Sequence, residues 1–220
     1  MTSEVPVPDL FGPPPAGVGL RVALVRHGEV DESVRGRCCG SLDPPLSDAG
    51  RRQMQRTSGL LQHLSAAAIY ASPRRRALDS AGALDVAAPT LVDDRLREID
   101  FGLLEGLTYQ DVADRYPGVW RLWMQQPIDV AFPDGERFAD FSARVDQALA
   151  DLAERHHGEA IVIVAHGGVN RLVLARALGL DLRHMFRLQQ TCGAVSLIDF
   201  YDDQAVVQVM NATSRVTTSC

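Results

Sequence analysis

The sequence has few cysteines, and they do not form the spaced pairs of a disulfide framework. The four are Cys38, Cys39, Cys192 and Cys220. Adjacent cysteines bridge poorly, and the spacing is not that of a zinc site. We therefore predict free thiols, no bound metal and a reducing cytoplasm as the compartment.

Long apolar runs and an excess of basic residues are also missing. No run reaches the length of a membrane span, and residues 1–15 lack the basic and apolar regions of a secretory signal. Lys and Arg number 22 against 28 Asp and Glu, a net charge of −6. This balance argues against nucleic acid or an anionic membrane as partner. Because metal motifs, Gly-rich dinucleotide loops and P-loops are absent, we expect no cofactor.

Two stretches that are present end in the same way. The apolar runs 20–26 and 160–165 have the length of a strand, and His27-Gly28 and His166-Gly167 follow them. Continuous apolar runs are typical of strands buried on both faces of a parallel sheet. Ligands bind at the carboxyl ends of such strands, so neighbouring strands would bring His27 and His166 to one site.

The order of the remaining segments predicts a single α/β domain with three α/β/α layers around a mostly parallel sheet. We expect a flexible, Pro-rich leader over 1–18, the domain over 19–213 and a tail over 214–220. An aromatic stretch at about 105–136 would form a small helical cap. The expected strands are 20–26, 67–71, 90–92, 160–165, 194–201 and 205–210. The expected helices are 47–64, 73–86, 108–116, 136–157, 168–178 and 182–188, with Ser72 as an N-cap.

Histidine, arginine and carboxylate side chains cluster near the predicted strand ends. They are Arg26, His27, Arg76, Glu98 and His166. Arginine forks match the oxygens of a tetrahedral dianion, and a neutral imidazole can attack phosphorus. The other histidine, if protonated, can stabilise the equatorial oxygens, and a carboxylic acid can protonate the leaving oxygen.

Each of these residues alone also fits an ordinary structural role. A histidine after a strand is usually a hydrogen-bonded structural residue, a run of arginines is usually a solvated helix face, and a lone glutamate usually lies on the surface. The repeated strand-His-Gly pattern favours a site over these alternatives.

Five motifs resemble those of the histidine phosphatase superfamily, the phosphoglycerate-mutase-like group, over residues 20–213. In chain order they are 25–29, 36–50, 72–81, 96–106 and 164–168. The resemblance implies metal-independent hydrolysis of a phosphomonoester, with His27 as the phosphorylated nucleophile and Glu98 as the proton donor. Arg26, Arg76 and His166 would bind the phosphoryl group. The register set by Ala77 and Ser80 selects Arg76 over Arg74 and Arg75.

Three further residues are candidates for phosphate or substrate binding. Ser33 stands where the family often has an asparagine that helps bind phosphate. Cys39 lies, with Cys38, at a loop position near the substrate. Gly167 lets the backbone after His166 come close.

The family holds phosphatases and mutases, and similar mutases carry a longer, basic insertion between the acid and the second histidine. The insertion here is short and acidic, which favours a phosphatase acting on a small phosphorylated metabolite. A phosphoglycerate-type mutase and a non-catalytic phosphate-binding module stay as alternatives. The sequence leaves open which ester is the substrate, whether Trp120 and Trp123 contact it, and whether the chain forms a homodimer.

Overall fold

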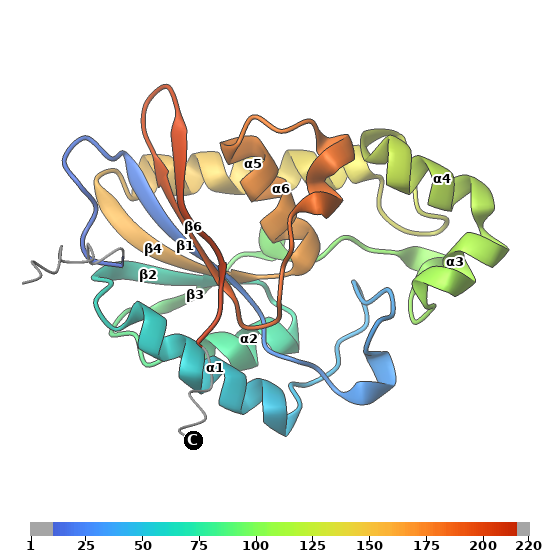
Figure 1. Ribbon diagram of the computed structural model, residues 1–220, viewed down its shortest axis with the longest axis horizontal. Helices are drawn as coiled ribbons and strands as arrows, with labels where there is room; N and C mark the ends of the chain where they lie inside the picture. The colour runs from blue at the N-terminus through green and yellow to red at the C-terminus, as the bar shows by residue number, and fades with distance from the viewer. Residues whose placement is uncertain (1–10, 215–220) are drawn as a thin grey trace, which may run out of the picture.

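A six-stranded sheet with the order β3-β2-β4-β1-β5-β6 forms the centre of the computed structural model, which describes residues 11–214 (Figure 1). The strands β3, β2, β4 and β1 are mutually parallel, whereas β5 runs antiparallel to β1 and to β6. This arrangement confirms the predicted mostly parallel sheet. The strands are β1 (Leu20–Arg26), β2 (Ala66–Ala71), β3 (Thr90–Val92), β4 (Glu159–Ala165), β5 (Val195–Phe200) and β6 (Ala205–Ala212).

Helices cover both faces of the sheet, as the α/β/α prediction required. The helices α1 (Asp48–Leu61) and α2 (Arg75–Gly82) lie on one face, and α5 (Phe138–Arg155) and α6 (Gly167–Ala177) lie on the other (Figure 1). The central strand β4 shows why its apolar run is continuous. Ile161 and Ile163 pack on the α5–α6 side, while Val162 and Val164 pack on the α1–α2 side.

The expected cap is a helical insertion beyond the carboxyl ends of the parallel strands (Figure 1). It contains α3 (Tyr109–Arg115) and α4 (Pro117–Gln125). Thr108 and Asp111 form the capping box that begins α3, and Pro117 is the first residue of α4. The 3₁₀ turns are η1 (Glu32–Val34), η2 (Asp94–Leu96), η3 (Gly102–Leu104), η4 (Pro127–Asp129) and η5 (Leu182–Arg187). Among the helices that the structure describes, none has the length and apolar character needed to cross a membrane.

The start of α2 differs from the prediction. We expected Ser72 as N-cap and Pro73 as the first helical residue, but the helix begins at Arg75 and its N-cap residue makes no side-chain cap. The buried Ser72 hydroxyl accepts the Arg74 N–H over 3.3 Å and lies 2.7 Å from Nε2 of His166. Asp43, from the loop before α1, accepts the Arg75 N–H over 2.7 Å and so satisfies a donor at the start of α2.

The N-terminal segment is held to the domain from residue 11 onward, whereas residues 1–10 and 215–220 lie outside the described part. Phe11 packs against the core beneath α1 and α2. The buried Arg21 on β1 donates to the carbonyls of Gly12 and Pro13 and forms an ion pair with Asp199. The flexible leader expected over 1–18 is therefore bound to the domain in its second half.

Candidate active site

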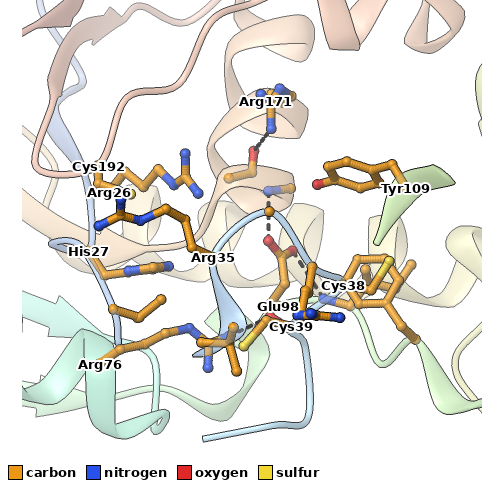
Figure 2. A pocket seen from close by; sticks show the side chains of 18 of the residues that line it. Arg26, His27, Arg35, Cys38, Cys39, Arg76, Glu98, Tyr109, Arg171 and Cys192 are labelled. Atoms are coloured by element: carbon orange, nitrogen blue, oxygen red, sulfur yellow. Dashed lines mark hydrogen bonds between the residues drawn. The ribbon is translucent and has the colours of Figure 1, made fainter. Parts of the chain in front are cut away.

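A cavity of about 370 Å³ lies between the carboxyl ends of the parallel strands and the cap. Its lining includes six of the residues selected from the sequence, and they come from five separate segments of the chain. They are Gly167 and, as labelled in Figure 2, Arg26, His27, Cys39, Arg76 and Glu98. The fold thus brings distant sequence motifs to the sheet edge where a site was predicted.

His27 and His166 are neighbours, as the two strand ends suggested. Strands β1 and β4 pair in parallel with Arg26 opposite Ala165, so the histidines follow at the same level of the sheet. Their ring centroids are 5.2 Å apart in an edge-on arrangement. His27 lines the cavity, whereas the fully buried His166 lies beside it and outside the lining.

Hydrogen bonding fixes the tautomer of His27. Its Nδ1 lies 2.7 Å from the Gly28 carbonyl oxygen, which can only accept, so Nδ1 carries the proton. A neutral ring then has its lone pair on Nε2, the atom that a nucleophilic imidazole must present.

Burial holds both rings in the neutral state. It lowers the pKa of His27 well below the ordinary 6.5, and the charges of Arg26 and Arg76 lower it further. The pKa of His166 is also lowered well below 6.5, by burial and then by Arg76, His27 and Arg26. Our sequence analysis considered a protonated His166, but the free site favours the neutral ring. An anion bound between the arginines would raise this pKa again, because it offsets their charge.

Two buried side-chain nitrogens at these strand ends have no hydrogen-bond partner within residues 11–214. They are Nδ1 of His166 and Nε of Arg26. A buried polar group without a partner costs about 1–3 kcal/mol, so native proteins rarely keep one without a reason. The oxygens of a bound phosphoryl group would satisfy both atoms.

Arg76 is the arginine of its triplet that reaches the cavity, in agreement with the motif register. Its guanidinium is almost fully buried and donates to the carbonyls of Leu42, Cys39 and Gly40 over 2.7, 2.9 and 3.2 Å. Arg75 is exposed and lies 3.8 Å from Asp79. Arg76 therefore holds the loop at 39–42 and presents positive charge to the cavity at the same time.

Glu98 lines the cavity, and its carboxyl group contacts the first turn of α6. Its Oε2 accepts the Gly168 N–H over 2.9 Å, and its Oε1 accepts the Ile99 N–H over 3.1 Å. A Cβ at position 168 would lie 2.3 Å from Oε1, so only glycine lets the carboxyl group approach. Gly168, the second glycine after His166, thus makes room for the acid, whereas the sequence indicated only a close backbone approach.

Arg144 on α5 fixes the segment that carries Glu98, and the sequence analysis did not find it. Its guanidinium donates to both carboxyl oxygens of Glu136 over 2.7 and 2.8 Å. It also donates to the carbonyls of Arg95, Arg97 and Glu98 over 2.6, 2.7 and 3.2 Å. All five N–H donors of the side chain are used in this way.

The remaining candidates separate into two groups. Cys39 lines the cavity, but Ser33 is exposed on η1 and lies outside the lining, so this geometry gives it no contact with a ligand there. Trp123 lines the cavity and packs on Phe101 and Phe132, whereas Trp120 does not line it. Of the two tryptophans, Trp123 is therefore the one that lies at the cavity.

The thiols of Cys38 and Cys39 in the cavity are poor nucleophiles. Burial raises the pKa of Cys38 to about 12 and raises the pKa of Cys39 as well, so both stay protonated near neutral pH. Cys38, Cys39 and Cys192 are free thiols. Residues 11–214 contain no cluster of three or more His, Cys, Asp or Glu side chains placed to hold a metal ion.

The α/β fold thus places a neutral imidazole beside two arginines, with a carboxyl group opposite. The chain belongs to the histidine phosphatase superfamily (branch 1), whose family model matches residues 22–213.

Relatives of known name cover most of the chain. Phosphoserine phosphatase 1 of Hydrogenobacter thermophilus is 31% identical over 90% of this chain and 94% of its own length. The α-ribazole phosphatase from Shigella flexneri has a solved structure that is 31% identical, with a TM-score of 0.76 over 87% of this chain and 96% of that chain. A bifunctional protein of Mycobacterium tuberculosis is 33% identical over 90% of this chain, which spans only 55% of that relative's length.

Proposed function

We propose that this chain hydrolyses a small phosphomonoester without a metal ion, through a phosphohistidine formed on His27. The observation that carries the proposal is the state of His27. Its Nδ1–H is bound to the Gly28 carbonyl, its pKa is lowered by burial, and Arg26 and Arg76 provide charge beside it. Such a ring has an available lone pair next to a site for a dianion.

The proposed reaction has two steps, and the same residues serve both. Arg26 and Arg76 bind the phosphoryl oxygens, and Nε2 of His27 attacks phosphorus while the ester P–O bond breaks. Glu98 in its acid form gives its proton to the leaving alkoxide, and the alcohol departs. The Glu98 carboxylate then takes a proton from water as its oxygen attacks the phosphohistidine. The P–N bond breaks, and His27 and the acid form of Glu98 are restored.

The cap favours hydrolysis over a mutase reaction. Its insertion contributes Tyr109 and Trp123 to the cavity and no basic side chain that would bind a second phosphate. Two of the relatives described above are named as phosphatases. We propose a small phosphorylated metabolite as substrate and, because the described cysteines are free thiols, a reducing cytoplasm as the compartment.

The test is release of phosphate from p-nitrophenyl phosphate with EDTA present, together with trapping of the phosphorylated protein. We expect activity without added metal and an acid-labile phosphate on the protein that His27→Ala abolishes. A requirement for added metal, or wild-type turnover in His27→Ala, would show that the proposal is wrong.

A further inference from the structure

Arg171 is a second positive centre in the cavity, and the proposed reaction does not use it. It lies on α6, four residues after Gly167, and is half-buried in the cavity lining (Figure 2). Its Nε donates to the Leu188 carbonyl over 3.0 Å, and its Nη1 donates to the Gly167 carbonyl over 3.3 Å. The guanidinium also lies over the ring of Phe186, 5.9 Å from its centroid. These contacts fix the orientation of the group before any ligand binds.

Arg171 has no acidic partner in the part of the chain that the structure describes. The cavity lining includes two carboxylates, and both have other contacts. Glu29 forms an ion pair with Arg35 at 2.6 Å, while Glu98 accepts the N–H groups of Gly168 and Ile99. Nη2 of Arg171 makes no hydrogen bond within the described residues. A fixed guanidinium with free Nη2 donors, whose neighbouring carboxylate Glu98 already accepts two N–H groups, is suited to an anionic ligand.

Arg171 lies beside Glu98, the acid that would protonate the leaving group in the proposed reaction. A Cβ on Gly167 would lie 3.0 Å from Arg171 Nη1 and 3.6 Å from Arg26 Cζ, so the two arginines flank the same glycine. Arg171 Nη1 donates to the Gly167 carbonyl, and Glu98 accepts the N–H of the next residue, Gly168. Arg171 and the acid therefore both lie at the start of α6.

We propose that Arg171 binds a carboxylate on the alcohol part of the substrate, so that the substrate class is the phosphate esters of small hydroxy acids. This inference rests on the proposed phosphatase function. A carboxylate fits better than a second phosphate, because the free N–H donors on Nη2 of a single guanidinium match one planar monoanion. A cavity of about 370 Å³ also limits the substrate to a small molecule.

The experiment compares two esters that differ only in charge. They are phosphoglycolate and its amide, in which a neutral carboxamide replaces the carboxylate. p-Nitrophenyl phosphate is the reference. We expect the wild-type kcat/KM to be about ten- to a hundredfold higher for phosphoglycolate than for the amide, the range given by charge-assisted hydrogen bonds. Arg171→Met should remove this preference. Arg176→Met is the matched control, because Arg176 lies on the same helix and pairs with Asp146 at the surface.

Three results would overturn the subsite. The first is a wild-type enzyme that does not distinguish the acid from the amide. The second is an equal loss on all three esters in Arg171→Met, which would place Arg171 on the transferred phosphoryl group. The third is a preference for glycol bisphosphate over phosphoglycolate that Arg171→Met removes, which would identify a phosphate subsite instead.

A binding measurement separates this inference from the proposed function. Titration calorimetry of His27→Ala with phosphoglycolate and with the amide reports the subsite without turnover. We expect the acid to bind about tenfold or more tightly than the amide, and Arg171→Met in the same background to abolish the difference. If this difference appears while the wild type hydrolyses no ester, the subsite stands and the phosphatase proposal fails. If both ligands bind equally, the subsite fails whatever the activity.

Discussion

The Arg144 guanidinium donates to the main-chain carbonyl of Glu98 over 3.2 Å, so helix α5 fixes the residue that delivers the proton in the proposed reaction. The same guanidinium binds the carbonyls of Arg95 and Arg97 and both carboxyl oxygens of Glu136. The position of the acid therefore depends on Arg144, which lies 46 residues later in the chain. Arg144 acts here as a positioning residue, because it does not line the cavity.

Arg144→Lys should impair proton donation more than phosphoryl transfer. Lysine has three donors and no planar fork, so it cannot hold three carbonyls and Glu136 together. We expect kcat/KM to fall about ten- to a hundredfold for an alkyl phosphate, whose alkoxide needs the proton. The loss should be several-fold smaller for p-nitrophenyl phosphate, whose phenolate leaves readily.

Steady-state kinetics on the two esters checks this prediction. Arg176→Lys serves as the control, because Arg176 is an exposed arginine that binds Ser142 and Asp146. Equal losses on both esters in Arg144→Lys would mean that Arg144 supports the fold alone and not the acid.

Gly168→Ala should also lower kcat/KM more for an alkyl phosphate than for p-nitrophenyl phosphate, but for a different reason. The new Cβ would lie 2.3 Å from Oε1 of Glu98, so the carboxyl group must leave the start of α6. We expect at least a tenfold loss on an alkyl phosphate and a smaller one on p-nitrophenyl phosphate. Gly118→Ala is the matched control, since Gly118 is also in a helix and its added Cβ would meet nothing within 4 Å. Wild-type kinetics in Gly168→Ala would contradict the tight packing of acid and glycine.

The pair of histidines could be predicted from sequence because it depends on local pattern. An apolar strand followed by His-Gly occurs twice, and parallel strands align their carboxyl ends. Arg76 was likewise accessible from its motif register. Ser72 was predicted wrongly because its sequence context suits an N-cap, while its hydroxyl lies against His166, a contact made across the sheet.

Arg144 and Arg171 could not be found in the same way. Arg144 contacts Glu98 through the packing of α5 on an irregular segment, and no spacing in the sequence indicates this contact. Arg171 left a weak signal, since it stands four residues after Gly167 and so on the same face of α6. Whether that face meets a cavity depends on the cap and on η5, whose Phe186 contacts it.

Arg76→Lys and Arg75→Lys test the choice between adjacent arginines. Arg76 donates to three loop carbonyls, and lysine cannot reproduce this geometry. We expect Arg76→Lys to lower kcat/KM about a hundredfold or more, and the free energy of unfolding by about 2–4 kcal/mol. Arg75→Lys should change neither by much, because Arg75 is exposed. Kinetics and urea unfolding measure both quantities, and the reverse pattern would show that the register is wrong.

The buried histidines should make the stability of the fold depend on pH. The folded protein holds the pKa values of His27 and His166 well below 6.5, chiefly by burial, while an unfolded chain leaves them near 6.5. Between these values the unfolded state binds more protons. The free energy of unfolding is therefore retained above pH 6.5 and falls as the pH drops toward the lowered pKa values, by at most about 1.4 kcal/mol per pH unit for each histidine.

Urea unfolding of the wild type and two variants at about pH 7.5 and about pH 5.5 isolates this contribution. His166→Gln removes one buried titrating ring, so its stability should fall less between the two pH values than that of the wild type. His63→Gln removes an exposed histidine and should fall as the wild type does. An identical pH dependence in His166→Gln and the wild type would mean that His166 is already protonated in the folded protein, and the neutral pair that the proposed reaction starts from would then be incorrect.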